Sequence, residues 1–451
     1  MFFLNPKYTK ASLKLALPVM ITQLGQVSVN LFDNVIVGKL LGAQALASVS
    51  LGNAVFLSFF VFTMGFSYAI PPLVAEAHSR LDHYKINSVF RHGFVINLTV
   101  GLLMVLLLFL GLPLLYHLDQ PKEIIPDTIQ FLTIMVFSMI PFTIFQTLRE
   151  VSEGLSFTIG VTKATIIANI LNIVLNYIFI EGKLGFPVMG IQGAALATLI
   201  ARIFMVSFLY IVLYRDPRTS RYIRAFHLRI TAFSTKMFNT LLKIGFPTSL
   251  QLFFEVSAFA GAAFVCGLVG STDIAAHQIA LSMASLTFNL CIGFSVASTV
   301  MVGRKLGEKD FIGLRNVGMN NLKIVFIFML ISGSIFIIVR NILPSFFVNK
   351  NEFNLVYLTS KLLIIAALFQ LSDGIQVTCL GCLRGIQDAK VPSIITFIAY
   401  WGITIPLGYF LCYTLKIGAF GMWIALGIGL TISALFLVIR FIRLTKRMES
   451  T

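Results

Sequence analysis

The sequence predicts an all-α integral membrane protein with twelve transmembrane helices in two related, pseudo-symmetric halves. Three observations predict this fold: an apolar composition, the number of long apolar runs, and an internal repeat. Of the 451 residues, 57% are hydrophobic and 12% are charged, and the mean hydropathy is +0.91. Soluble domains carry about 25% charged residues, so the composition alone indicates a membrane protein.

The individual helices are predicted from windows of about 20 apolar residues, the length that crosses the hydrocarbon core. Twelve windows are expected, centred on Val27, Phe60, Leu103, Phe137, Ile170, Phe204, Phe259, Leu286, Phe328, Leu368, Phe397 and Leu430. Because twelve is even, both termini lie on one side of the membrane. Most of the 34 lysines and arginines fall in the two tails and in alternate loops, which predicts that both termini are cytoplasmic.

The net charge of +16 is therefore interpreted as a signal of topology. Nucleic-acid binding would need a basic soluble domain, and the sequence contains none, so no nucleic-acid partner is expected.

A long basic linker divides the chain, and the segments on either side of it resemble each other. Pro18 in LALPVM corresponds to Pro247 in IGFPTS, and the GFS motif at 65–67 corresponds to a second GFS at 293–295. Each half has an even number of helices, so the two copies share one orientation, which is a known transporter plan. The expected parts are a six-helix lobe at 1–214, a basic cytoplasmic linker at 215–235 and a second six-helix lobe at 236–451.

Three carboxylates lie deep inside predicted helices: Asp33, Glu255 and Asp373. A charge at the bilayer centre costs about 2.5–3.5 kcal/mol on insertion scales, so each acid needs a reason. The one deep cation is Arg202, which either pairs with one of the acids or extends to the lipid headgroups. With no cationic partner on a facing stripe, the acids are predicted to be cation sites. A desolvated carboxyl group retains a proton, or binds Na⁺ together with neighbouring oxygens.

Common enzyme signatures are missing. The chain has no P-loop for nucleotide phosphates, no H-E-x-x-H zinc motif and no G-x-S-x-G nucleophile motif. We therefore expect a protein that is not an enzyme and uses no organic cofactor or transition metal.

Several motifs resemble those of one family of transporters. They are the GFP before an embedded glutamate at 245–255, AAHQIAL at 275–281, LRGIQDAKVP at 383–392, LNIVLNYIFIEG at 171–182 and LFDNVIVGKLLGAQALA at 31–47. Together with twelve helices in two parallel halves, they resemble the multidrug and toxic-compound extrusion (MATE) family, in its bacterial NorM-type branch.

The resemblance implies an antiporter of the bacterial inner membrane that exchanges Na⁺ or H⁺ for amphipathic, mostly cationic compounds. It implies two lobes forming a V around a central cavity, and it favours a monomer. It assigns Glu255 and Asp373 to a coupling-cation site in the C-terminal lobe, and Asp33, Asn172 and Asn176 to a second polar cluster in the N-terminal lobe. Polar residues on the same helical stripes are the candidates for lining the cavity: Gln26, Asn30, Gln251, Gln278, Ser285 and Asn289.

The sequence leaves alternatives open. Either Na⁺ or H⁺ can be the coupling ion, and either acid cluster can be the coupling site. The leading rival function is a flippase of lipid-linked oligosaccharides or other lipids in the same superfamily, although such a flippase needs a cationic cavity for its anionic substrate. A channel would need its acids in a ring, which this arrangement does not offer.

Overall fold

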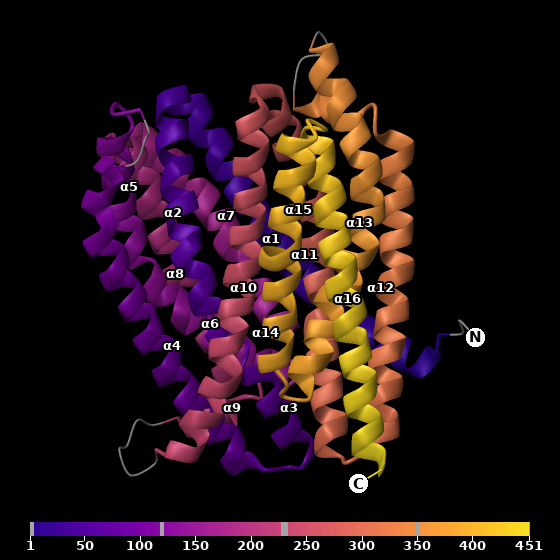
Figure 1. Cartoon of the computed structure of the whole chain (residues 1–451). Coiled ribbons are helices and arrows are strands. Elements are labelled where there is room, and N and C mark those ends of the chain that lie inside the picture. Colours follow the sequence, from indigo (N-terminus) through magenta and orange to yellow (C-terminus); the bar gives the residue numbers. More distant parts are fainter. Residues whose placement is uncertain (1–3, 118–120, 227–232, 348–351, 451) are drawn as a thin grey trace. The chain divides into compact units, whose positions relative to one another are not determined.

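The computed structural model describes residues 4–117, 121–226, 233–347 and 352–450. Within these ranges the chain is almost entirely helical and contains no strand (Figure 1). The middle of the expected basic linker, including Arg229, lies outside the described residues.

The helices up to the linker are α1 (Pro6–Leu41), α2 (Ala43–Ser67), α3 (Ile70–Ser79), α4 (His83–Gly111), η1 (Leu112–His117), α5 (Ile125–Phe137), α6 (Met139–Gly154), α7 (Ile159–Glu181), η2 (Lys183–Gly185), α8 (Gly190–Arg215) and α9 (Ser220–Arg224). Those after it are α10 (Thr235–Val269), α11 (Ser271–Gly307), α12 (Phe311–Val339), η4 (Leu343–Phe346), α13 (Phe353–Gly385), α14 (Lys390–Phe397), η5 (Ile398–Thr404), α15 (Ile405–Tyr409), η6 (Phe410–Thr414) and α16 (Ala419–Ser450).

The prediction of twelve apolar spans is confirmed. Eleven helical stretches among the described residues are long and apolar enough to cross a membrane, and a bent pair, α5 and α6, supplies the twelfth. The two helices of this pair meet at an angle of 40°. Pro141 explains the break, because a proline ring clashes with the carbonyl four residues earlier, which here belongs to Phe137, the last residue of α5.

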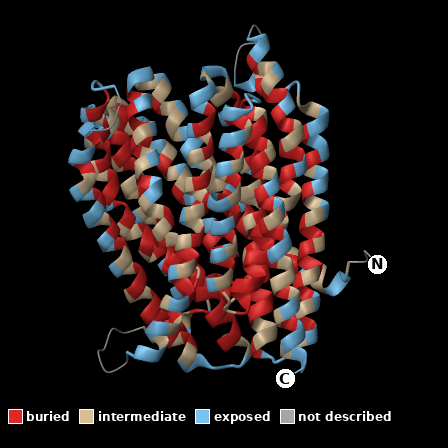
Figure 2. Cartoon of the chain, in the orientation of Figure 1, coloured by how far each residue is buried: buried red, intermediate tan, exposed pale blue. Residues whose placement is uncertain are grey.

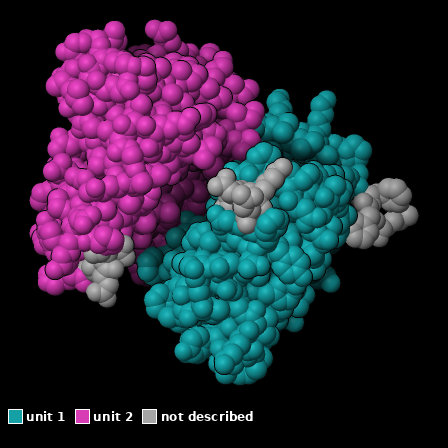
Figure 3. All heavy atoms as spheres, turned by 90° about the horizontal axis from the view of Figure 1, so that it is seen from above, with its two compact units in different colours: residues 1–20, 250–451 teal, residues 21–249 magenta. Residues whose placement is uncertain are grey.

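The described chain forms two compact units. Unit 1 comprises residues 1–20 and 250–451, and unit 2 comprises residues 21–249 (Figure 3). Each unit boundary falls two residues after a proline inside a long helix, after Pro18 in α1 and after Pro247 in α10. The expected lobes, 1–214 and 236–451, are based on the sequence repeat and stay a prediction. The two units are defined by contacts between residues, and their boundaries divide α1 and α10 just after these prolines.

The backbone repeats as the sequence does. Asp82 caps α4 by accepting a hydrogen bond from the Lys85 amide at 2.9 Å, and Asp310 caps α12 in the same way from Gly313 at 2.8 Å. The residue before each cap, Leu81 or Lys309, is left-handed, with φ of 57° and 59°. Non-glycine residues rarely adopt this conformation, so a matched pair at the same spacing supports a duplication.

The repeated GFS motif has a packing role in both units. A Cβ atom on Gly65 would lie 2.2 Å from Cα of Ser249 within unit 2. In unit 1, a Cβ atom on Gly293 would lie 2.6 Å from the Met20 side chain and 2.8 Å from the carbonyl oxygen of Ala16. Glycine is therefore required where the first part of α10 crosses α2 and where the first part of α1 crosses α11.

Gly65→Ala is expected to destabilise the protein by about 1–3 kcal/mol, because the added methyl group collides with backbone rather than with a movable side chain. The matched control is Gly427→Ala in α16, where a new Cβ atom would have no neighbour within 4 Å. Thermal unfolding in detergent should show a lower Tm for the first variant and an unchanged or higher Tm for the control. Equal Tm values would contradict this packing.

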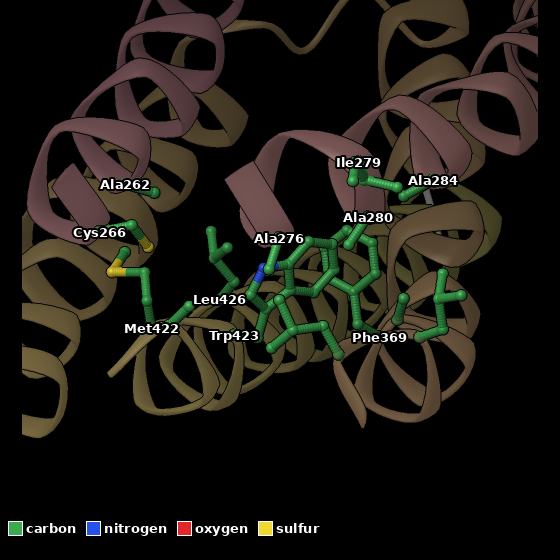
Figure 4. Packing of buried hydrophobic residues seen from close by; sticks show 14 of the residues in the cluster. Ala262, Cys266, Ala276, Ile279, Ala280, Ala284, Phe369, Met422, Trp423 and Leu426 are labelled. Carbon is green, nitrogen blue, oxygen red and sulfur yellow. The ribbon is translucent and has the colours of Figure 1, made fainter. Parts of the chain in front are cut away.

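Buried residues run along the inner faces of the helices in both units (Figure 2). In unit 1 the core is built around Trp423 of α16, which is fully buried together with Ala276 and Ala280 of α11 and Phe369 of α13 (Figure 4). The Phe369 and Trp423 rings meet edge to face, with centroids 5.4 Å apart. Alanines facing large aromatic rings allow the helices to pack closely, which fixes the helices that carry the candidate site.

Candidate functional site

The two acids of unit 1 lie on different helices. Glu255 is on α10 with 6% of its surface exposed, and Asp373 is on α13 with 3% exposed. Their carboxyl groups lie close enough to repel each other. Two buried acids within reach of each other favour the capture of a cation or a proton, because both cannot stay ionised and unpaired in an apolar interior.

A tyrosine and a glutamine complete this group. Tyr400, fully buried, accepts a hydrogen bond on its hydroxyl oxygen from Nε2 of Gln376 at 2.9 Å and lies within hydrogen-bonding reach of Glu255. Three oxygen atoms then make no hydrogen bond among the described residues: Oε1 of Glu255, Oδ1 of Asp373 and Oε1 of Gln376. A buried acceptor without a partner costs about 1–3 kcal/mol, so these oxygens form a set that a cation would satisfy. We call these four residues the unit 1 acid cluster.

Tyr400 is positioned by an irregular part of its helix. It lies in η5, a π-helical stretch between α14 and α15, and Pro406 follows shortly after. The Thr404 hydroxyl donates to the carbonyl oxygen of Ala399 at 2.9 Å, inside this stretch. Proline removes one backbone donor and favours such a distortion, and π-helical turns occur often at functional sites.

Glu255 has a positive charge in its surroundings that the sequence did not indicate. Arg384, at the end of α13, lies within electrostatic reach of it. The Arg384 side chain donates to Oγ of Ser295 at 2.9 Å, and that hydroxyl donates to the carbonyl oxygen of Val377 at 2.6 Å. α13 continues to Gly385 and buries this arginine.

The acid of unit 2 lies in a chain of polar groups from three helices. Asp33 of α1 accepts a hydrogen bond at 2.6 Å from Nδ2 of Asn176 on α7. The same nitrogen lies 3.1 Å from Oδ1 of Asn172, and Nδ2 of Asn172 donates to Thr198 of α8 at 3.3 Å. The three residues expected to cluster are therefore brought together, and Thr198, which sequence reasoning missed, joins them. We call these four residues the unit 2 acid cluster.

Asp33 also has a positive charge in its surroundings. The charge of Arg202 on α8 acts on Asp33. The two residues nevertheless form no ion pair within the described part of the chain. Of the two roles that the sequence leaves open for Arg202, this position favours the one beside an acid.

The candidate cavity residues are divided between the units. Gln26 and Asn30 belong to unit 2, and Gln251, Gln278, Ser285 and Asn289 belong to unit 1. Gln251 is buried, whereas Asn30 and Gln278 are exposed. Asn289 is satisfied locally, since its side chain donates to the carbonyl oxygen of Ser285 at 2.7 Å. Their common role in a substrate cavity stays a prediction.

Sequence reasoning also missed a buried group of charges in α6. Arg149 and Glu153 form an ion pair of 2.7 Å, with 0% and 1% of their side chains exposed, and Glu150 beside them is equally buried. Charged residues near the end of a predicted helix are expected to be exposed to solvent, and these are not. The i to i+4 spacing of opposite charges was the available signal.

No three His, Cys, Asp or Glu side chains in the described ranges gather closely enough to hold a metal ion. A cation bound at either acid cluster would therefore use amide, hydroxyl or backbone oxygens beside the carboxylates. Such mixed oxygen sets suit hard, weakly bound ions.

Comparisons with known proteins agree with this fold and with the sequence resemblance. The MatE family model matches residues 18–178 and 247–410, one match in each half. The probable multidrug resistance protein NorM of Agrobacterium fabrum is 33% identical over 98% of this chain and 95% of its own length. The multidrug resistance protein NorM of Photobacterium profundum is 33% identical over 96% of this chain and 94% of its own.

A solved structure extends the comparison to the fold. The crystal structure of a MATE protein in complex with MaL6 has a TM-score of 0.89 at 21% identity, and the match covers 98% of both chains. At this identity the likeness concerns the fold alone. The family match in both halves and the full-length relatives go further: this multi-pass membrane protein belongs to the MatE family.

Proposed function

We propose that the protein is a cation-coupled antiporter that exports amphipathic, mostly cationic compounds across a bacterial inner membrane, with both termini in the cytoplasm. The observation that carries the proposal is the unit 1 acid cluster, where Glu255, Asp373 and Gln376 present buried oxygens without hydrogen-bond partners. The relatives' description as multidrug resistance proteins supports the export of drugs.

The mechanism follows from competition for negative charge. An empty acid cluster attracts an organic cation from the cytoplasm, and the Na⁺ or H⁺ that enters from outside neutralises the same charge, so the organic cation is released. Each ion supplies about 2.3 kcal/mol per 100 mV of membrane potential, in addition to its concentration gradient. Alternating access requires that the ion and the substrate prefer different conformations, because a ligand shifts an equilibrium only by its difference in affinity.

Efflux from proteoliposomes tests this proposal. The purified protein, expected to be a monomer, is reconstituted with a fluorescent lipophilic cation inside, and an inward Na⁺ gradient or an inward proton gradient is imposed separately. We expect one of the two gradients to accelerate efflux of the dye, which names the coupling ion. Liposomes without protein provide the control. If neither gradient acts and a fluorescent anionic lipid is moved between leaflets instead, the flippase alternative replaces the antiporter.

A further inference from the structure

A caged, half-buried arginine lies in unit 2. The guanidinium carbon of Arg202 lies 5.0 Å from the ring centroid of Phe56, 5.2 Å from that of Phe142 and 5.7 Å from that of Phe60. All three distances are within the range of cation–π attraction. The cage is itself packed, since the Phe60 and Phe142 centroids are 4.4 Å apart. We call these three rings the phenylalanine cage.

One hydrogen bond anchors the guanidinium. Nη1 of Arg202 donates to Oγ of Ser138 at 2.7 Å, and Ser138 caps the end of α5 at the bend between α5 and α6. Ser138 both ends α5 and begins α6, so this hydrogen bond fixes the bend and part of the role of Arg202 is structural. A neutral donor such as glutamine could make the same hydrogen bond. The hydrogen bond to Ser138 alone therefore does not explain why this position carries a positive charge.

The charge has a counterpart in Asp33. Arg202 lies one helical turn after Thr198 of the unit 2 acid cluster, on the same face of α8, so its charge acts on Asp33. The carboxylate is nevertheless hydrogen-bonded to Asn176 and not to the guanidinium. The phenylalanine cage and Ser138 thus hold a permanent positive charge near the acid but out of contact with it, since arginine does not lose its proton in proteins.

We propose that Arg202 is the built-in counter-charge of the unit 2 acid cluster, a positioning residue that weakens the hold of Asp33 on the coupling cation so that the cation can leave. This inference rests on the proposed function, because it assumes that Asp33 binds the ion. A unit charge roughly 10 Å away, at an effective dielectric of about 20, changes the affinity for a cation on the order of tenfold. Such a device suits a transporter, which must release its ion in every cycle.

The test measures the half-saturating concentration of whichever ion drives efflux, in proteoliposomes containing wild type, Arg202→Gln or Arg202→Lys. For Arg202→Gln we expect a value on the order of tenfold lower, because Asp33 then binds the cation without competition. Arg202→Lys keeps the charge and should remain within a few-fold of wild type. In an Asp33→Asn background, Arg202→Gln should produce no further shift.

A second variant keeps the proposal testable if Arg202→Gln does not fold. Phe142→Leu removes one ring of the cage and keeps the charge, so the guanidinium is free to approach Asp33, and the half-saturating concentration should rise. An unchanged half-saturation in both Arg202→Gln and Phe142→Leu, with Tm alone affected, would overturn the proposal in favour of a purely structural arginine. The proposal would also be overturned if Arg202→Lys shifted the half-saturating concentration as much as Arg202→Gln does.

The failure of this proposal differs from that of the antiporter proposal. If the antiporter proposal fails, wild type itself shows no ion-driven efflux. Equilibrium binding of radioactive Na⁺, or proton uptake, by the purified wild type and Arg202→Gln proteins then gives the same comparison without transport. Equal affinities in the two proteins would refute the counter-charge.

Discussion

Glu255→Gln is expected to reduce ion-driven efflux about 100-fold or more while the protein still folds. Glutamine has the same shape but no charge, so the unit 1 acid cluster loses the group that attracts the cation, and a loss of roughly 3 kcal/mol of binding corresponds to about 100-fold. Folding should be unaffected, because burying a neutral amide costs less than burying a carboxylate. The measurement is the initial rate of dye efflux at a fixed gradient, with Tm recorded in parallel.

Glu352→Gln is the matched control for this prediction. Glu352 precedes α13, the helix that carries Asp373, but it is exposed and its side chain makes no capping hydrogen bond. Its replacement should leave efflux unchanged. Asp373→Asn should resemble Glu255→Gln, whereas comparison with Asp33→Asn identifies the unit that couples. Normal efflux by Glu255→Gln and Asp373→Asn would show that the unit 1 acid cluster is structural.

Arg149→Leu is expected to destabilise the protein by about 3–5 kcal/mol. The Arg149–Glu153 pair is almost completely buried, and removal of one partner leaves the other charge without compensation in an apolar interior. The triple variant Arg149→Leu/Glu150→Leu/Glu153→Leu should recover most of this loss, because Glu150 is buried beside the pair and a buried ionic group is often replaced by apolar residues without cost. Unfolding in detergent, followed by circular dichroism, measures both effects.

An exposed ion pair offers the contrast. Arg315 and Glu449 lie 2.9 Å apart with 28% and 23% of their side chains exposed. Arg315→Leu should therefore cost no more than about 1 kcal/mol. If Arg149→Leu is equally mild, or if the triple variant is worse than the single one, burial does not determine the energy of this pair.

Several features of the candidate site could be predicted from the sequence because they are local. The spacing of Asn172 and Asn176 on one face of a helix follows from 3.6 residues per turn, and the structure brings both beside Asp33. The depth of Glu255 and Asp373 in long apolar runs predicted their burial, which is confirmed. In both cases one helix and its composition contain the needed information.

Other features depend on contacts between distant segments. Tyr400 and Glu255 are on different helices, and nothing in the apolar run around Tyr400 marks it as a partner. Arg384 follows Asp373 on the same helix, but whether it reaches Glu255 of α10 depends on how the two helices pack. The cage around Arg202 joins α2, α6 and α8, and no pattern within one helix reveals it.

The sequence by itself determined the membrane class, the number of spans and the repeat, since apolar windows and a recurring spacing depend only on the order of residues. It also located the three deep acids. Only the tertiary structure decided the partners of these acids, and it showed that α1 and α10 each divide between the two units just after a proline. The physical reason is that a lipid-spanning helix is selected by its own hydropathy, whereas the neighbour of a buried charge is selected by packing between helices far apart in the chain.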